Sequence, residues 1–531
     1  MTVGAADAAG GQGPVFRFLA EATNHPGASQ VDVIETHGNV VFLAGAFAWK
    51  VKRAVHFPYM DFSTLARRQK ACLEEMAVNA RLAPDLYIAC LPITRAASGA
   101  LAIDGRGETV EWVVKMHRFA QDDLLSAHAA AGPLPLDLAT AVADCVKASH
   151  EAAEVEDDVG GSTRIASVLH NLVDALREAP LDPALVEQFA KLAADRLAAV
   201  RDLLDRRAAS GCVRRCHGDL HAANIVVWKG RPVLYDAIEF DPDLATIDTL
   251  YDLAFLLMDL DRRGQRAAAN AILNRYLWLG RSDLDLEGLA ALPLFLAVRA
   301  AIRGLVTGER AAQEAGAAGE ADRRAAHELL ARAVAYLDAT QPVLVAVAGL
   351  SGTGKSTLAA RLAPCIPPAP GAVHLRTDLI RKALAGAGAT ERLPATTYTR
   401  EASARVYAEL ARQARIALGA GASVVADAVS AHAEERAALR QIARDMNVPF
   451  RGLWLTAPAD TLIARVAARR NDASDATADV VRAQIAWQTG DPGEGWTAID
   501  AGGTPEATLH AAQRALDDIL SSPSDNTGPD P

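Results

Sequence analysis

The stretch Gly349-Leu350-Ser351-Gly352-Thr353-Gly354-Lys355-Ser356 has the spacing G-x-x-x-x-G-K-S. An apolar run favouring a strand, residues 343–348, precedes it, and the residues from Thr357 onward have helical spacing. Glycines let several backbone N–H groups converge on one phosphate group, and a helix N-terminus adds a favourable dipole. Strand, glycine loop and helix in this order predict a phosphate-binding loop (P-loop) rather than a chance glycine turn.

Two side chains of the loop have expected roles toward the phosphates of ATP. The side chain of Lys355 adds a positive charge, and the hydroxyl of Ser356 is a candidate ligand for Mg²⁺. The predicted nucleotide-binding residues of this loop are Gly349, Leu350, Ser351, Gly352, Thr353, Gly354, Lys355, Ser356 and Thr357.

The bulk properties of the chain narrow the class of protein. A chain of 531 residues is too long for one ordinary core and predicts several domains. The formal net charge is −11, so nucleic acid, which needs a concentrated basic surface, is not the expected main partner. We find no signal-peptide pattern at the start, no apolar run long enough to span a bilayer, and six cysteines without a C-x-x-C pair. These features predict a cytoplasmic protein that does not enter a membrane, and they leave its oligomeric state open.

Hydrophobic periodicity divides the chain into parts. We expect a flexible lead over 1–30, with a short helix near 16–22, and then a small sheet with one helix over 36–119, which includes a hairpin of 99–104 with 109–116. Helices dominate 134–207. Strands are expected over 225–228 and 232–235, and apolar helices over 248–259 and 289–305. The Ala-rich range 309–340 is interpreted as a surface helix plus linker. From 341 to 520 strands alternate with helices, which predicts an α/β domain with a parallel sheet covered on both faces. The predicted domains are 31–338 and 339–520, followed by a disordered tail over 521–531.

A second set of candidate residues lies upstream, in the polar loop from His217 to Asn224. Phosphoryl transfer to a hydroxyl needs a carboxylate on the acceptor side and oxygen ligands for Mg²⁺. Asp219 fits the first role, while Asn224 and Asp236, one strand later, fit the second. Far upstream, Lys50 on a strand and Glu75 on the next helix can pair, with Lys52 and Glu74 as alternatives to them.

These residues resemble the aminoglycoside phosphotransferase and choline-kinase-like branch of the protein-kinase fold, over about residues 30–310. The match is H-G-D-x-x-x-x-N at His217–Asn224, followed by the strand-borne Asp236. The resemblance implies a bilobal kinase-like fold of α+β type, with Lys50 and Glu75 beside the nucleotide and Met116 in the hinge strand. The chain departs from the wider pattern because no G-x-G-x-x-G precedes Lys50.

Other interpretations of the same loop stay open. Cys212, Cys216, His217 and His221 are residue types that bind zinc, but four ligands within ten residues lack the usual separation of two pairs. A purely structural loop is another alternative. We interpret the nearby Asp248 and Asp252 as carboxylates that cap a helix or fix the loop.

Beyond the P-loop, three further features predict phosphoryl transfer. Asp378 follows a predicted strand, where it is either the base that takes a hydroxyl proton or a helix cap, and Arg381 lies one turn further on. The strand that ends at Asp427 resembles a Walker B strand, whose carboxylate orders Mg²⁺. Arg465 and Arg469 share a helix face and either close over the transferring phosphate or form a solvated basic face.

Residues 341–520 resemble the small P-loop kinases: gluconate kinase, chloramphenicol phosphotransferase, the zeta-toxin family and the polynucleotide 5′-kinase domain. The whole layout resembles a family of bacterial two-domain ATP-binding proteins. It implies a tandem ATP- and Mg²⁺-dependent phosphotransferase acting on small-molecule hydroxyl groups. The alternatives are a P-loop kinase regulated by a ligand-sensing pseudokinase half, and phosphorylation of a polynucleotide 5′-hydroxyl or a nucleotide sugar.

Overall fold

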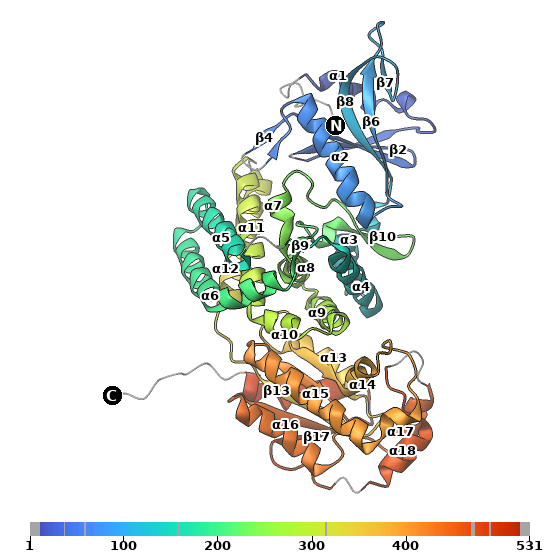
Figure 1. Ribbon diagram of the computed structural model, residues 1–531, viewed down its shortest axis with the longest axis vertical. Helices are drawn as coiled ribbons and strands as arrows, with labels where there is room; N and C mark the ends of the chain where they lie inside the picture. The colour runs from blue at the N-terminus through green and yellow to red at the C-terminus, as the bar shows by residue number, and fades with distance from the viewer. Residues whose placement is uncertain are drawn as a thin grey trace, which may run out of the picture. The chain divides into compact units, whose positions relative to one another are not determined.

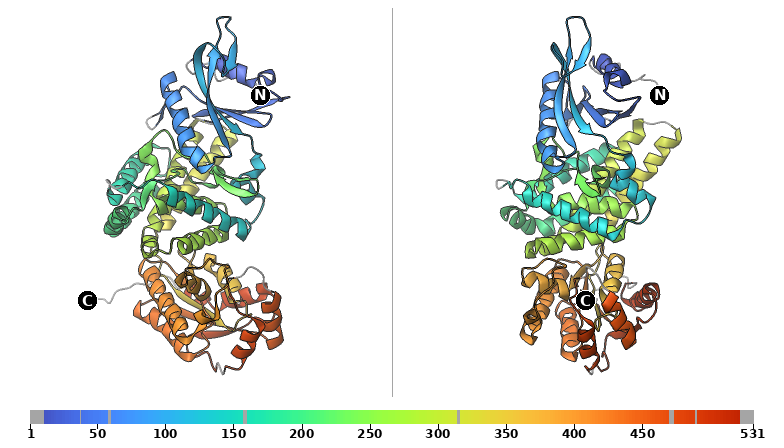
Figure 2. Two further views of the ribbon diagram at one scale, coloured as in Figure 1. Left: turned by 45° about the vertical axis from the view of Figure 1, so that its right-hand side comes forward. Right: turned by 90° about the vertical axis from the view of Figure 1, so that its right-hand side faces the viewer.

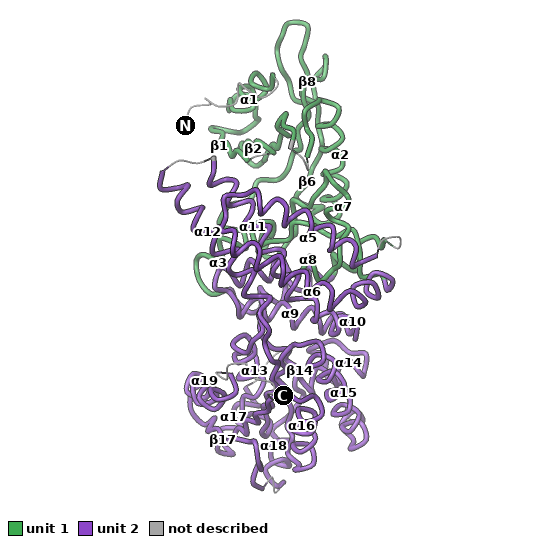
Figure 3. The backbone as a smooth tube through the Cα atoms, turned by 90° about the vertical axis from the view of Figure 1, so that its left-hand side faces the viewer, with its two compact units in different colours: residues 1–133, 148–157, 211–253 green, residues 134–147, 158–210, 254–531 purple. Residues whose placement is uncertain are grey.

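A computed structural model describes residues 11–36, 38–57, 60–156, 160–313, 316–468, 473–487 and 490–520. Its chain forms two compact units, coloured in Figure 3: unit 1 contains residues 1–133, 148–157 and 211–253, and unit 2 contains the remainder. The expected disordered tail over 521–531 lies outside the described residues. The expected boundary at 338/339 falls between a helix that ends at Leu337 and a strand that begins at Leu344, and it stays a prediction.

Unit 1 contains a six-stranded antiparallel sheet with an apolar cluster of side chains on each face. Along its strands, alternate residues face helix α1 (Gly13–Ala20) on one side and helix α2 (Leu65–Leu82) on the other. The strands, in spatial order, are β1 (Val31–Glu35), β2 (Asn39–Ala44), β3 (Phe47–Lys52), β8 (Glu108–His117), β6 (Tyr87–Arg95) and β7 (Leu101–Ile103).

The short helix expected near 16–22 is confirmed as α1, which is followed by the 3-10 turn η2 (Ala22–Asn24). Val15, Phe16 and Leu19 of α1 are buried against the sheet, so this part of the expected lead is folded. The expected hairpin of 99–104 with 109–116 is wrong. Strands β7 and β8 both pair with β6, which continues through Pro92 to Arg95 and lies between them.

The rest of unit 1 carries the polar loop from residue 216 to 224. This loop leaves strand β9 and ends in a hairpin of β10 and β11, while β9 pairs with β12 just before helix α8. The bounds are β4 (His56–Phe57), β5 (Met60–Asp61), η3 (Gln121–Asp123), α3 (Leu125–Ala131), β9 (Val213–Arg215), η4 (Ala222–Asn224), β10 (Ile225–Trp228), β11 (Arg231–Leu234), α7 (Pro242–Ala245), β12 (Thr246–Asp248) and α8 (Thr249–Arg262).

The first part of unit 2 is helical, as expected. Its elements are α4 (Leu136–Ala152), α5 (Gly161–Glu178), α6 (Pro183–Ala209), α9 (Arg266–Gly280), α10 (Asp283–Glu287), η5 (Gly288–Ala290), α11 (Leu292–Gln313) and α12 (Gly316–Leu337). Helix α12 is a surface helix, as expected: one face is buried through Leu329, Leu330 and Ala333, while Arg323, Arg324 and Glu328 are exposed. Within the described chain, no single helix meets the length and composition of a membrane span, although the bent pair Asp283–Ala290 and Leu292–Ala312 meets them together.

The second part of unit 2 is an α/β domain built on a five-stranded parallel sheet, which confirms the expected fold class. The strand order is β14 (Val373–Arg376), β15 (Val424–Asp427), β13 (Leu344–Gly349), β16 (Phe450–Thr456) and β17 (Trp496–Asp500). Figures 1 and 2 show helices on both faces, with α13 and α19 packed against the valines of β13 on one of them. The helices are α13 (Lys355–Leu362), η6 (Ala363–Cys365), α14 (Thr377–Leu384), η7 (Ala395–Tyr398), α15 (Arg400–Gly419), α16 (Ala433–Asp445), α17 (Ala459–Ala468), α18 (Ala478–Ile485), α19 (Pro505–Arg514) and α20 (Asp517–Leu520).

Candidate active sites

The P-loop connects β13 to α13, as the sequence predicts, and its glycines are needed for steric reasons. Gly349 has a φ of 138°, and a Cβ there would lie 2.5 Å from the carbonyl oxygen of Leu455. At Gly352, φ is 89° and a Cβ would lie 2.6 Å from the oxygen of Leu462. Gly354 caps α13, so the N–H groups of Lys355, Ser356 and Thr357 begin a helix whose N-terminus favours an anion.

Two carboxyl groups lie where β14 and β15 end beside this loop. The two strands are adjacent and parallel, with Arg376 opposite Asp427, and Asp378 follows two residues after Arg376. Asp378 is the second residue of α14, whose N-cap is Arg376, so the interpretation of Asp378 as the N-cap is wrong. Parallel strands end at a common edge, which is where open α/β sheets bind ligands.

The environments of these two groups drive their pKa values apart. Burial, and then the charge of Asp427, raises the pKa of the Asp378 carboxyl above its usual value. Burial alone would also raise the pKa of Asp427, but a hydrogen bond from His374 and the charges of Arg376 and Lys355 hold it at about 2. The surroundings of the two carboxyl groups therefore shift their pKa values in opposite directions.

The side chains that hold Asp427 were missed in the sequence. His374 lies on β14, and its Nε2 is 3.4 Å from Oδ2 of Asp427, while Nε of Arg376 is 3.6 Å from the same oxygen. Burial lowers the pKa of His374, so its neutral ring donates to the carboxylate. Both residues point to one side of β14 by strand alternation, which was the available signal.

The arginines predicted to act on the phosphate are held by other groups in this structure. Arg381 donates to the carbonyl oxygen of Thr397 at 2.7 Å and to Ser403 Oγ at 3.3 Å, and its guanidinium lies over the ring of Tyr398. Arg465 donates to the carbonyl oxygens at positions 501 and 503, at 2.8 and 3.1 Å. Arg469 lies outside the described residues. The catalytic roles of all three stay predictions.

Asp475 is a further residue whose role the sequence did not reveal. Its carboxylate accepts hydrogen bonds from the ammonium of the buried Lys382 at 3.0 Å, from Tyr398 at 2.6 Å and from the backbone of Leu393 at 3.0 Å. These bonds tie the segment before α15 to α14, which carries Asp378. The wall beside Asp378 is therefore fixed by one carboxylate far along the chain.

In unit 1, Lys50, Lys52, Glu75 and Glu239 form a buried network, and the partly exposed Asp236 joins it at its edge. Nζ of Lys50 is 2.8 Å from Oε1 of Glu75, which confirms the predicted pairing of these two residues. Lys50 also forms an ion pair with Asp236. Lys52, on the same face of β3, lies 2.6 Å from Oε2 of Glu75 and forms an ion pair with Glu239. Because Lys50 joins Asp236 and Lys52 does not, Lys50 is the lysine in contact with the predicted metal ligand.

The charges of this network are mutually stabilised. Burial lowers the pKa of Lys50, but the carboxylates of Asp236 and Glu75 outweigh burial and leave that pKa well above its usual value. Burial raises the pKa of Asp236, and the charge of Lys50 outweighs it, so that pKa is lowered. An ionised Asp236, held at a positive φ of 61°, is suited to bind a cation.

The catalytic-loop residues lie beside this network. Nδ2 of Asn224 donates to Oδ2 of Asp219 at 3.0 Å and to its carbonyl oxygen at 2.9 Å, so the amide fixes the carboxylate predicted to be the base. His217 Nε2 bonds the carbonyl oxygen of Tyr235 at 2.9 Å, next to Asp236. Met116 is buried on β8, where it pairs with Ala48 across the sheet.

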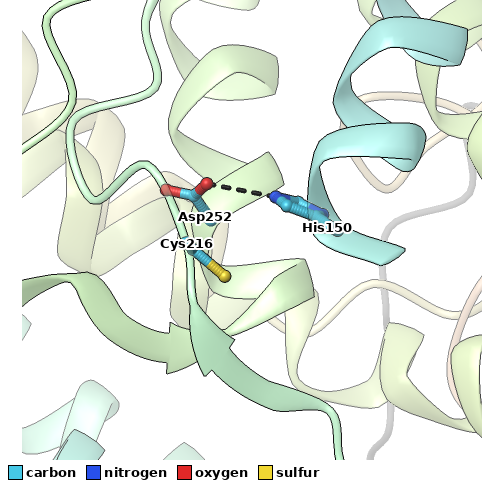
Figure 4. Close-up of side chains that lie close together, drawn as sticks. All are labelled: His150, Cys216 and Asp252. Carbon is cyan, nitrogen blue, oxygen red and sulfur yellow. Dashed lines mark hydrogen bonds and ion pairs between the residues drawn. The ribbon is translucent and has the colours of Figure 1, made fainter. Parts of the chain in front are cut away.

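Asp252 holds the base of the loop. It accepts the N–H groups of His217 at 3.2 Å and Gly218 at 2.9 Å, and Nε2 of His150 lies 3.1 Å from its Oδ2 (Figure 4). This confirms the interpretation of Asp252 as a loop-fixing carboxylate. Figure 4 also shows Cys216 beside this pair; within the described residues, these are the three potential ligand atoms that gather within 4.8 Å.

The zinc alternative finds no support in this geometry. The ring of His221 accepts the N–H of Ala223 and lies 3.4 Å from Asp219, and the ring of His217 bonds Tyr235. Cys216 bonds the carbonyl oxygen of Ile247. Within the described part of the chain, no group of potential metal ligands brings Cys212, Cys216, His217 and His221 together.

Comparison with known proteins defines the class. Residues 344–490 match the family model of an AAA domain, and 118 residues of the chain are 34% identical to an adenylyl-sulfate kinase of Myxococcus xanthus, over 22% of this chain and 59% of that protein. Together with the P-loop, these matches support a nucleotide-binding domain over residues 344–490 and a phosphotransferase activity in general.

The chain belongs to the family of a mycobacterial protein. Over 476 residues it is 31% identical to an uncharacterised protein of Mycobacterium tuberculosis (strain ATCC 25618 / H37Rv), a match that covers 87% of this chain and 91% of the relative.

Among solved structures, an aminoglycoside 2′-phosphotransferase-IIIa matches 61% of this chain and 99% of its own, at 15% identity and a TM-score of 0.38. A gluconokinase from Sinorhizobium meliloti matches 34% of this chain and 95% of its own, at 20% identity and a TM-score of 0.26.

Proposed function

We propose that the P-loop domain is an ATP- and Mg²⁺-dependent kinase that transfers the γ-phosphate to a hydroxyl group of a small molecule. The observation that carries the proposal is the position of Asp378 and Asp427 at the carboxyl ends of adjacent parallel strands, beside the strand that leads into the P-loop. A carboxylate that accepts a hydroxyl proton is suited to transfer onto an alcohol, whereas a motor or switch protein needs only water at that place.

The residues present fit the cofactors. Asp427 is ionised and buried, the hydroxyl of Ser356 lies in the first turn of α13, and both oxygen types suit Mg²⁺, which would neutralise charge on the transferring phosphate. The positive charge of Lys355 lowers the pKa of both Asp378 and Asp427, which supports a shared site. The P-loop amides bind the phosphates, and Asp378 takes the acceptor's proton.

We propose a second phosphotransferase site in unit 1, with Asp219 as its base and Asn224 and Asp236 as its metal ligands. The support is the orientation of Asp219 by Asn224 and the Lys50–Asp236 ion pair. A small-molecule acceptor suits both sites, since a net charge of −11 disfavours nucleic acid.

One observation favours a sensor role for unit 1 instead. Strands β1 and β2 are joined by a tight turn, in which the N–H of Thr36 donates to the carbonyl oxygen of Asn39 at 2.9 Å. Such a turn offers no glycine-rich cover for a triphosphate. Unit 1 would then bind a ligand without transferring phosphate.

The test is transfer of label from γ-labelled ATP to a pool of hydroxyl-bearing metabolites by the full-length protein and its Asp219→Asn and Asp378→Asn variants. We expect two classes of labelled product, each lost in one variant. Products lost only in Asp378→Asn would support the sensor role of unit 1. Labelling of a 5′-hydroxyl oligonucleotide or a nucleotide sugar in place of the pool would replace the small-molecule acceptor, and absence of any transfer would refute the proposal.

A further inference from the structure

Gln484, on α18, bonds directly to the phosphate-binding loop. The backbone N–H of Ser351 donates to Oε1 of Gln484 at 2.8 Å, and both residues are only 6% exposed. A backbone N–H can only donate, so the carboxamide oxygen must face the loop and the NH₂ group must point elsewhere. Among the described residues, the carboxamide makes this hydrogen bond and no other. This largely buried side chain thus carries two donor hydrogens beside the loop, for which the described residues provide no acceptor.

The position of Ser351 in the loop indicates which ligand atoms lie near the NH₂ group of Gln484. Nζ of Lys355 lies 3.1 Å from the carbonyl oxygen of Leu350, the residue before Ser351. In a P-loop this lysine serves the β- and γ-phosphates. The Leu350–Ser351 tip is therefore on the side of the terminal phosphates, away from the helix N-terminus that begins at Lys355.

The packing of α18 holds Gln484 in position before any ligand arrives. Val481, one turn earlier, is buried in a cluster with Leu462 and Val466 of α17, and Leu350 packs against the same cluster. The loop tip therefore packs against the same apolar cluster that joins α17 to α18. A donor that is already placed loses little conformational entropy on binding.

We propose that Gln484 binds the terminal phosphate of ATP, with Oε1 docked on Ser351 and Nε2 donating to a γ-phosphate oxygen. The proposal rests on the proposed function of the P-loop domain and adds a residue from α18 to its phosphate site. It accounts for a polar carboxamide in a helix that is otherwise packed through apolar side chains. If Gln484 only shaped the loop, its loss would affect all nucleotides equally, so ATP and ADP distinguish the two roles.

The test measures nucleotide binding locally in the full-length protein. Hydrogen–deuterium exchange of the peptide containing Gly349–Ser356 is followed against ATP–Mg²⁺ and ADP–Mg²⁺, so binding to unit 1 does not interfere. The variants are Gln484→Met, of similar shape without donors or acceptors, and Gln484→Glu, which keeps the acceptor for Ser351. Gln441→Met is the control, because Gln441 is an exposed residue of α16 that bonds Asp445 at 2.7 Å.

For Gln484→Met we expect the half-protecting ATP concentration to rise about tenfold, and that of ADP less than about threefold, as a hydrogen bond to a charged group implies. Gln484→Glu should weaken ATP further, since its carboxylate would face the phosphate, and Gln441→Met should change neither nucleotide. Equal weakening of ATP and ADP, or no change, would overturn the assignment. Absence of protection in the unaltered protein would instead remove the proposed kinase function itself.

Discussion

Replacing Asp378 by Asn tests the proposed chemistry most directly. Asn cannot accept the hydroxyl proton, and loss of a general base lowers a rate by about 10²–10⁴-fold, which is about 3–5 kcal/mol in the activation free energy. The assay is kcat/KM for transfer to the acceptor found by screening. Asp479→Asn is the control, because Asp479 is exposed on α18 and forms an ion pair with Arg482. We expect the fall in Asp378→Asn alone.

The pH dependence provides an independent check on the same residue. Burial and Asp427 raise the pKa of Asp378, so the acidic limb of kcat/KM should lie above the usual range of an aspartate, with activity rising as Asp378 loses its proton. Asp427, with a pKa of about 2, stays ionised throughout and cannot cause this limb. The charge of Arg376 lowers the pKa of Asp378, so Arg376→Met should move the limb to higher pH.

Stability separates lost catalysis from lost folding. An aspartate whose folded pKa is raised stabilises the fold only at low pH, and that contribution is lost as pH rises through the folded pKa. At neutral pH the neutral Asn should therefore be tolerated, and the thermal midpoint of Asp378→Asn should not fall. Full transfer activity together with an unchanged midpoint would refute the assignment of Asp378 as base.

Three further predictions follow from the two sites. Lys50→Met should abolish Asp219-dependent transfer without affecting transfer at the P-loop site. Lys52→Met should mainly lower the stability of unit 1, by about 3–5 kcal/mol, because it leaves buried carboxylates without a counter-charge. Hydrogen exchange in α2 measures the stability of unit 1 in the two variants. Gly352→Ala should lose ATP protection of the P-loop peptide, whereas Gly421→Ala, at a similar positive φ with nothing within 4 Å of the new Cβ, should keep it. Asp252→Asn should speed amide exchange at 217 and 218 and lower kcat more than it raises KM.

Elements with strong local signals could be predicted from the sequence. The P-loop, the five parallel strands and the loop from His217 to Asn224 each combine a fixed motif with a clear change of hydrophobic period. The hairpin of 99–104 with 109–116 failed because a turn of glycines indicates only that the chain reverses, and not which strand lies next to which. That pairing depends on β6, residues 87–95, which precedes both segments of the expected hairpin in the sequence.

The sequence by itself determined that there are two candidate phosphate sites and which residue types serve them. The reason is that each motif is a spacing of residues close together in the chain, which can be recognised without the tertiary structure. Only the tertiary structure decided how those groups are tuned. The pKa values of Asp378 and Asp427 shift in opposite directions because of burial and because His374, on the neighbouring strand, bonds Asp427. Lys50, rather than Lys52, is the lysine beside the predicted metal ligand because it contacts Asp236. Gln484 reaches Ser351 from 133 residues away, and no local pattern encodes such a contact, since it arises only when separate helices pack around the loop.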